Sequence, residues 1–235
     1  MEYLPSIILF LVTSICGILA VIIQKKLDNS IKLFLSFSGA FLLSTCVIHL
    51  LPEIFGHKDL NVGPFILLGF FLQIIIEYIS QGVEHGHIHP PHETVKFPLF
   101  IYLGLCFHAF TEGLPLADVN FNNMMSSPLY WGILLHKLPI VIVLATLFST
   151  YKIKTYTSVF SLIIFSLLAP LGGYTGKMIS DFSDSDIVPY FLAISTGIFL
   201  HISTVILFET SHNHRFNFIK FFFILIGGLL AVFLF

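Results

Sequence analysis

The sequence predicts an all-α membrane protein, with eight transmembrane helices that form a single domain over residues 1–235. The first observation is composition: 56% of the residues are hydrophobic and only 10% are charged, whereas a soluble domain carries about 25% charged residues. The second is the length of the apolar runs, because each is close to the ~20 residues that a helix needs to cross a bilayer. Little of the chain is left for loops, which excludes a sizeable soluble domain.

The apolar runs follow one another with only short polar segments between them. The first run is not expected to be a cleavable signal peptide, because Glu2 precedes it and a basic segment does not. Residues 82–96 are expected to form a polar, histidine-containing loop. The eight helices are expected at about 4–24, 33–55, 62–81, 97–119, 128–149, 156–178, 187–210 and 216–235.

Lysine and arginine are unevenly divided between alternate loops, and this division predicts the orientation of the chain. One side receives eight of these residues and the other receives two, when Lys137, which lies inside a span, is left out. The side with eight charges is expected to be cytoplasmic, so that both termini lie outside and the loop 82–96 lies inside. We therefore expect a multi-pass protein of the plasma membrane, which in a prokaryote is the inner membrane. The eight residues are Lys25, Lys26, Lys32, Lys96, Lys152, Lys154, Arg215 and Lys220, and the two are Lys58 and Lys177.

Charge and cysteine content exclude two further classes of protein. The formal net charge is -2, so that no basic surface favours nucleic acid. The three cysteines, Cys16, Cys46 and Cys106, all lie in apolar runs. We expect them to be small buried side chains and not a disulfide framework.

Ionisable side chains inside the expected spans are the strongest functional signal, because such groups are costly in a membrane and usually face a cavity or one another. A single membrane histidine is more often a packing residue than a ligand, but here several histidines lie one or two turns from an acid. Two pairs, His49 with Glu53 and His108 with Glu112, have the i, i+4 spacing that puts both side chains on one helix face. The full set is His49, Glu53, Glu77, His108, Glu112, His136, Lys137, His201 and Glu209.

His108, Glu112 and His136 are expected to meet near the middle of the membrane. Their spans are antiparallel neighbours, and counting residues from the loop between them places Glu112 and His136 only about 1.5 Å apart in depth, with His108 within one turn. Imidazole and carboxylate ligands suit Zn²⁺ and neighbouring divalent ions, and the absence of cysteine from the set disfavours Cu(I). Pro115 and Pro139 fall in the same layer, where each removes a helical hydrogen bond, as in the broken helices of transporter binding sites.

These motifs resemble those of the ZIP (Zrt/Irt-like) metal transporters. His-Ala-Phe-Thr-Glu-Gly at 108–113 and Leu-Leu-His-Lys-Leu-Pro at 134–139 are similar to the paired motifs of the branch that has HxxxEG in span 4 and HK in span 5. Similarities to the family's spans 2, 3, 6 and 7 lie at 43–53, 69–77, 169–172 and 201–209. The resemblance implies a ZIP-like bundle with both termini outside, and movement of one helix bundle past another to expose the metal on alternate sides.

Three positions depart from the pattern of the many ZIP proteins that hold two metals. Ala109 and Lys137 occupy positions where those proteins have an asparagine and an acid, and Ile140 occupies the position of a fourth ligand. The resemblance therefore implies one transport metal. Lys137 is expected to replace the second metal by pairing with Glu112; the alternative is that Lys137 points away toward water.

The other ionisable groups allow more than one interpretation. His49 and Glu53, near the outer end of their span, are either a relay that captures metal at the outer mouth or interfacial hydrogen-bonding residues. His201 near mid-span and Glu209 near the cytoplasm are expected to serve as an exit or proton relay, and Glu77 is expected to be a helix-packing partner. The loop histidines, which either receive metal or belong to a solvated tether, are His85, His87, His89, His92, His212 and His214.

Together these expectations predict a transporter that moves a divalent metal, first of all Zn²⁺, into the cytoplasm. Fe²⁺, Mn²⁺ and Cd²⁺ are further candidate substrates, and neither a catalytic cofactor nor an enzymatic activity is expected. The expected partners are the ion and membrane lipid, and a homodimer is compatible with the pattern. An intramembrane zinc hydrolase would use the same ligands to activate water, but the chain lacks HExxH and has Lys137 beside the site. A membrane metal sensor without flux is the other alternative.

Overall fold

The computed structural model describes residues 3–23, 29–56, 61–86, 97–120, 122–183, 187–209 and 218–235, and within these ranges the chain forms helices and no strand. Seven helical stretches there are long and apolar enough to cross a membrane, and a further apolar helix has 16 residues. The expected all-α membrane fold is confirmed, and the helix bounds agree with the expected spans to within a few residues. The long helices are α1 (Leu4–Ile23), α2 (Asn29–Thr45), α4 (Gly63–Ser80), α5 (Leu99–Gly113), α6 (Pro128–Thr150), α7 (Thr155–Phe182), α8 (Val188–Glu209) and α9 (Phe218–Phe233).

The second span is not one regular helix. α2 continues through a π-helical turn, Cys46–Leu50 (η1), into the short helix α3 (Leu51–Gly56). Pro52 follows this turn and has no N–H to donate to the Ile48 carbonyl, so the regular hydrogen-bond pattern is interrupted here. Short π-helical turns are rare and frequently mark functional segments.

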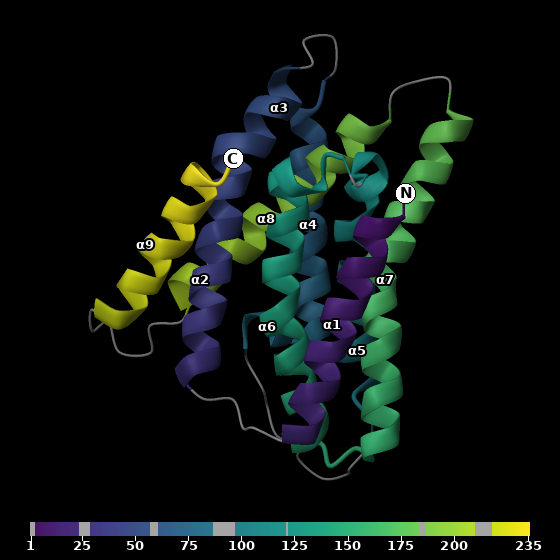
Figure 1. Ribbon diagram of the computed structural model, residues 1–235, viewed down its shortest axis with the longest axis vertical. Helices are drawn as coiled ribbons and strands as arrows, with labels where there is room; N and C mark the ends of the chain where they lie inside the picture. The colour runs from purple at the N-terminus through teal and green to yellow at the C-terminus, as the bar shows by residue number, and fades with distance from the viewer. Residues whose placement is uncertain are drawn as a thin grey trace.

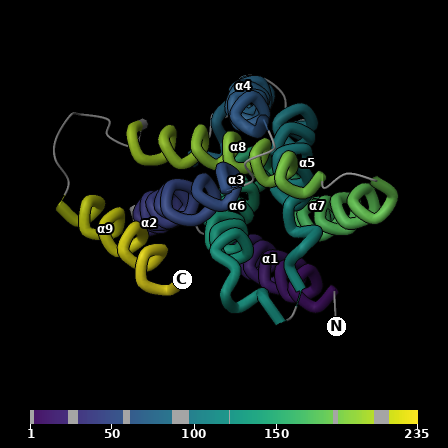
Figure 2. The backbone as a smooth tube through the Cα atoms, turned by 90° about the horizontal axis from the view of Figure 1, so that it is seen from above, coloured from purple at the N-terminus to yellow at the C-terminus, as the bar shows by residue number. Residues whose placement is uncertain are grey.

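The helices pack in two groups. In the first group α7 contacts α1, α5 and α6, and α1 also contacts α6; in the second, α2 contacts α8 and α9, and α4 contacts α8. Seen from above, α2 and α9 lie on one side and α1 and α7 on the other (Figure 2). The groups meet where α2 contacts α6, where α4 contacts α5, and where α8 contacts the 3₁₀ turn Leu114–Asp118 (η3) that follows α5. Both chain ends lie toward the same end of the bundle as α3 (Figure 1), as an even number of crossings requires.

Glycine lets helix backbones touch inside each group. A Cβ atom on Gly197 of α8 would lie 1.9 Å from the carbonyl oxygen of Ile66 in α4. A Cβ atom on Gly172 of α7 would lie 2.2 Å from the carbonyl oxygen of Phe110 in α5. Any side chain at these two positions would therefore push the paired helices apart.

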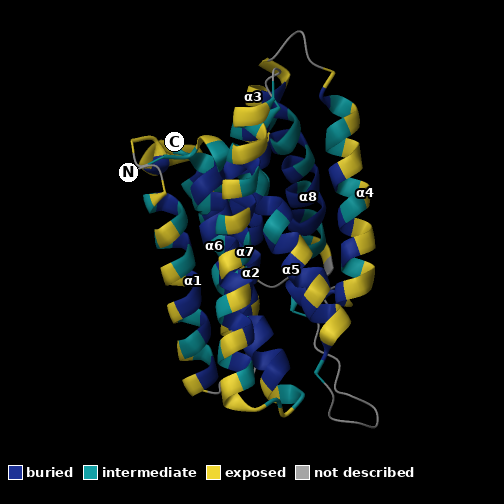
Figure 3. Ribbon diagram, turned by 90° about the vertical axis from the view of Figure 1, so that its right-hand side faces the viewer, coloured by how far each residue is buried: buried dark blue, intermediate teal, exposed yellow. Residues whose placement is uncertain are grey.

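The outward faces of the outer helices are apolar, as the hydrocarbon of a bilayer requires. Figure 3 shows exposed residues along α1 and α4, and the large exposed side chains there are aliphatic or aromatic. Buried histidines, carboxylates and a lysine lie inside, so the polar side chains are enclosed by an apolar surface. The exposed large side chains of these two helices are Ile7, Leu11, Val12, Ile15, Leu19, Ile22, Ile23, Leu67, Leu68, Phe71, Ile74, Ile75, Tyr78 and Ile79.

Candidate metal-binding site

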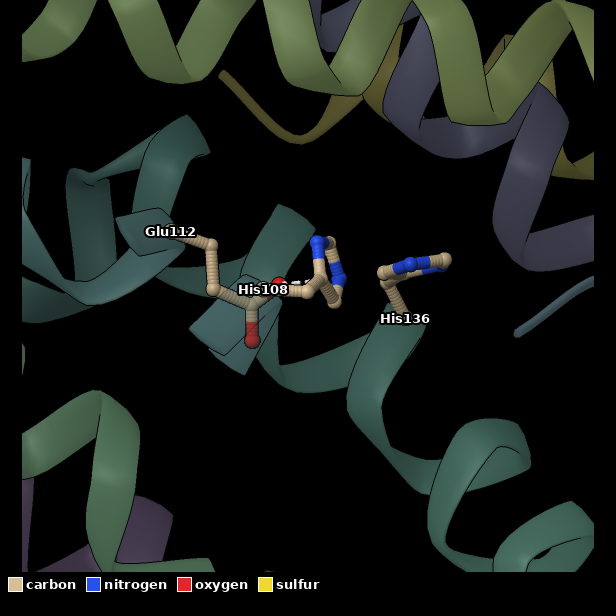
Figure 4. Close-up of side chains that lie close together, drawn as sticks. All are labelled: His108, Glu112 and His136. Carbon is tan, nitrogen blue, oxygen red and sulfur yellow. Dashed lines mark ion pairs between the residues drawn. The ribbon is translucent and has the colours of Figure 1, made fainter. Parts of the chain in front are cut away.

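His108, Glu112 and His136, here called the Glu112 site, are neighbours in the interior of the bundle (Figure 4). Each offers one ligand atom, and these atoms all lie within 4.8 Å of one another. His108 Nε2 is 3.3 Å from Glu112 Oε2, one turn further along α5. The ring of His136, on α6, meets that of His108 edge to face, with 6.1 Å between centroids. The count of residues along the two spans thus predicted correctly which side chains come together.

The imidazoles of the Glu112 site are buried and have ring nitrogens without a hydrogen-bond partner in the described part of the chain. All three side chains are 0% exposed, and in the described part of the chain neither ring nitrogen of His136, nor Nδ1 of His108, has a hydrogen-bond partner. Buried polar atoms nearly always have a partner. A tetrahedral Zn²⁺ with bonds of about 2.0–2.2 Å holds its ligand atoms about 3.4 Å apart, so side-chain shifts of about an ångström would let all three ligands reach one ion. Two imidazoles and a carboxylate are a donor set that suits such an ion.

Lys137 follows His136 in α6 and directs its ammonium group to Glu112. Lys137 is 0% exposed, and its Nζ forms an ion pair with Glu112 Oε1, while His108 faces the other oxygen. The same Nζ lies 4.7 Å from the centroid of the Phe165 ring, a cation–π distance. The ammonium therefore points into the site and not toward water.

Prolines interrupt the helical hydrogen bonds beside the site. Pro115 is the second residue of η3, so the carbonyl of Thr111 loses the donor that a continued α-helix would supply. Ser195 of α8 donates a hydrogen bond to this carbonyl, at 3.1 Å. In α6, Pro139 likewise cannot donate to the carbonyl of Leu135. Sequence reasoning missed Ser195, because a serine in an apolar span carries no signal until its partner on another helix is known.

A second cluster, here called the Glu77 cluster, consists of Glu77 on α4, His85 just after α4, and His201 on α8. Glu77 Oε1 is 3.6 Å from His85 Nε2, and Glu77 Oε2 is 3.5 Å from His201 Nδ1. His85 is only 3% exposed, because it belongs to a 3₁₀ turn, Val83–His85 (η2), that packs against α4, α6 and α8. The ring of Phe70 covers His201 edge-on, at 5.0 Å between centroids. His85 therefore differs from the expected polar loop, and Glu77 contacts two histidines that sequence reasoning had not connected with it.

The pair expected near the outer mouth does not belong to either cluster. His49 Nε2 is 2.9 Å from the carbonyl oxygen of Ala231 in α9, and the ring also contacts Phe235 edge to face. Glu53, one turn further along, is exposed. The contact of His49 with α9 is the kind that its interpretation as an interfacial hydrogen-bonding residue predicts.

Some of the predicted residues fall outside the described part of the chain. Glu209 is the last residue of α8, but its side chain is not among those described. The loop histidines outside the described ranges are His87, His89, His92, His212 and His214.

The fold and these two clusters define a class: a multi-pass α-helical membrane protein whose interior carries a set of histidine and carboxylate side chains suited to a metal ion. Residues 91–235 match the family model described as ZIP Zinc transporter. That match covers more than half of the chain, and the protein therefore belongs to the ZIP zinc transporter family. Members of this family transport metal ions and do not use them as catalytic cofactors, so a divalent metal ion is the substrate. No curated protein matches the chain.

Proposed function

We propose that this protein carries Zn²⁺ across the membrane into the cytoplasm, with His108, Glu112 and His136 as ligands of the transported ion. The observation that carries the proposal is the Glu112 site itself, whose three ligand atoms lie within 4.8 Å of one another in a fully buried setting. Ionisable groups there are costly unless they serve a substrate or one another, and a metal gives the imidazole nitrogens the partner they lack. Water or a mobile side chain completes the coordination. Fe²⁺, Mn²⁺ and Cd²⁺ are the alternative substrates.

The direction of transport depends on the orientation of the chain. Eight lysines and arginines lie on one side of the spans and two on the other, which favours both termini outside. The membrane is then the plasma membrane, or the inner membrane in a bacterium. Lipid covers the apolar outer faces, and the arrangement is compatible with a homodimer.

In this proposal the ammonium group of Lys137 replaces the second metal ion of a two-metal site. Its ammonium group is paired with Glu112 Oε1, which is a position that a bridged second ion would otherwise occupy. The pairing keeps Glu112 ionised through a nearby opposite charge. Oε2, which faces His108, is left for the transported ion.

The Glu77 cluster is proposed as the site that binds the metal ion next, on its way from the Glu112 site to the cytoplasm. Its carboxylate lies between two imidazoles at 3.6 and 3.5 Å, and such ligands bind metal only after they lose their protons. Glu209 and the loop histidines His87 and His89 are proposed to receive the ion after this cluster. On the outer side, His49 and Glu53 are proposed to capture the ion.

Release requires the Glu112 site to open, and we propose that one helix group moves past the other. Inside the groups, backbones touch at Gly197 and Gly172. At the contact between α2 and α6, in contrast, a Cβ atom on Gly132 would meet only side-chain atoms, Leu42 Cδ1 at 3.3 Å and Thr45 Cγ2 at 3.7 Å. Side chains can repack during a movement, which agrees with a boundary of movement between α2 and α6. Where the groups meet at α4, a Cβ atom on Gly104 of α5 would also lie 3.3 Å from the backbone nitrogen of Ser80.

Metal uptake into proteoliposomes tests the proposal against both alternatives. A transporter accumulates Zn²⁺ inside the vesicles at a rate that saturates with concentration. A zinc hydrolase and a metal sensor bind the ion without accumulating it. Binding without uptake by folded protein would therefore contradict the proposal.

Counting bound ions tests the part assigned to Lys137. Protein with the loop histidines replaced should bind one ion in the Glu112 site, as measured by equilibrium dialysis and located by anomalous scattering. Two ions within reach of Glu112, with Lys137 intact, would contradict the substitution of a lysine for the second cation.

A further inference from the structure

Glu84 is a fully buried carboxylate that belongs to neither metal-ligand cluster. Its Oε2 accepts a hydrogen bond of 2.5 Å from Ser80 Oγ, and its Oε1 accepts one of 3.1 Å from Gln73 Nε2. Both donors are also 0% exposed and lie on α4. A buried carboxylate without such partners would be strongly unfavourable, so the two hydrogen bonds bind the segment that carries Glu84 firmly to α4.

The backbone just before Glu84 is bent sharply. Gln81 and Gly82 both have left-handed conformations, with φ of 56° and 68°, and Gly86 has a third, with φ of 90°. Gln81 and Gly82 end α4 and lead the chain into the short turn η2 (Val83–His85), which packs against α4, α6 and α8, and Gly86 ends the turn. A left-handed conformation is unfavourable for a residue other than glycine, so contacts of the turn must offset the cost at Gln81. The buried hydrogen bonds of Glu84 are such contacts.

We propose that Glu84 is a positioning residue that holds η2 against α4 and thereby keeps His85 next to Glu77. His85 follows Glu84 directly, and its Nε2 lies 3.6 Å from Glu77 Oε1. Glu84 is not itself a ligand in this proposal: its two oxygens accept hydrogen bonds from Ser80 and Gln73, which hold the turn against α4. Its importance for transport rests on the proposed role of the Glu77 cluster, but the position of the turn can be tested separately.

Thiol labelling of a His85→Cys variant measures the position of the turn. The variant is made in protein whose Cys16, Cys46 and Cys106 are replaced by serine, and it is labelled with a hydrophilic maleimide. We expect slow labelling when Glu84 is present and a rate about tenfold higher with Glu84→Ala, because loss of the buried hydrogen bonds lets the turn open. Glu84→Gln should restore slow labelling, since its amide oxygen can accept from Gln73 while its NH₂ donates to the Ser80 hydroxyl.

Two further variants keep this test decisive. Ser80→Ala removes one of the two donors and should raise the labelling rate by a smaller factor. This variant provides the test if Glu84→Ala does not fold. Met125→Cys, at an exposed position between α5 and α6, should be labelled equally fast whether or not Glu84 is replaced. Unchanged labelling at position 85 in both Glu84→Ala and Ser80→Ala, or equal acceleration by Glu84→Ala and Glu84→Gln, would overturn the proposal.

Transport kinetics test whether Glu84 acts through His85. Zinc uptake by Glu84→Ala should match that of His85→Ala, and the double variant should be no worse than either, because residues that act as a unit are not additive. Additive losses would overturn the proposal. If Glu77→Gln and His201→Ala left uptake unchanged while the labelling result held, the role proposed for the Glu77 cluster would be overturned and the positioning of the turn would stand.

Discussion

The Glu112 site and the Glu77 cluster use the same kinds of side chain but compensate their charges differently. Glu112 is 0% exposed and forms an ion pair with Lys137, which is also 0% exposed. The Glu77 side chain is 23% exposed and is flanked by two histidines. A carboxylate that is cut off from water needs a paired counter-charge, whereas one that is partly exposed is also stabilised by water. This contrast agrees with the roles proposed above, in which the Glu112 site binds the transported ion and the Glu77 cluster receives it next.

The largest effect is expected for Glu112→Ala, which removes a ligand and leaves the Lys137 ammonium buried and unpaired. Such a charge costs about 3–5 kcal/mol, so we expect loss of Zn²⁺ uptake together with a clearly lower unfolding temperature of the purified protein. Adding Lys137→Met should restore the unfolding temperature, because the unpaired charge is gone, while uptake stays absent. A Glu112→Ala/Lys137→Met protein with normal uptake would show that Glu112 is not a ligand.

A loss of uptake without loss of stability is expected for His136→Ala and His108→Ala. Neither change leaves a charge unpaired, so both proteins should remain folded in the membrane, but uptake should fall at least about 100-fold because a ligand is missing. His49→Ala removes a histidine that lies outside the Glu112 site and contacts α9, and it should lower uptake at saturating Zn²⁺ far less. Normal uptake by well-expressed His136→Ala protein would remove that residue from the site.

A smaller effect is expected at the Glu77 cluster. Glu77→Gln keeps the size of the side chain but removes the charge between His85 and His201, and we expect the maximal rate of uptake to fall about tenfold. Protein stability should change little, because the Glu77 side chain is partly exposed. Comparing unfolding temperatures of Glu77→Gln and Glu112→Ala tests the contrast directly. Equal destabilisation by the two changes would contradict it.

The smallest effect is expected for His49→Ala and Glu53→Gln. Their place near the outer end of the span predicts a higher apparent KM for metal, by about two- to fivefold, with less change in maximal rate. His49→Ala also removes the hydrogen bond to the Ala231 carbonyl, which should lower the free energy of unfolding by only about 1 kcal/mol. Uptake measured over a range of Zn²⁺ concentrations separates the two quantities. A collapse of the maximal rate with KM unaltered would assign these residues to the moving parts and not to capture.

Much of the fold and of the Glu112 site could be predicted from the sequence, because both depend on local regularities. The hydrophobic runs gave the helix bounds to within a few residues, since the bilayer fixes how long an apolar helix must be. The rise per residue along two antiparallel neighbours placed Glu112 level with His136, and the ligand atoms do lie together. The pairing of Lys137 with Glu112 followed from the same count.

The Glu77 cluster could not be predicted, because it depends on where the chain goes after α4. Residues 82–96 read as a polar loop, yet the left-handed residues Gln81 and Gly82 lead the chain into a buried turn. Glu84 then accepts hydrogen bonds from side chains of α4, one of them from Gln73, eleven residues earlier in the chain. The period of a helix does not predict that contact. Glu77 was therefore expected to be a packing residue, although it contacts histidines from two other segments.

The sequence by itself determined the class of the protein, the spans, and the candidate ligands that two successive helices bring to one depth. These features depend on the apolar length of each segment and on a fixed rise per residue, which the chain cannot change. Only the tertiary structure decided which oxygen of Glu112 faces Lys137, that Ser195 donates a hydrogen bond to the Thr111 carbonyl, and that His85 is buried next to Glu77. Each of these contacts joins residues of different helices or turns, and their geometry is fixed by packing and by the need of buried polar groups for partners.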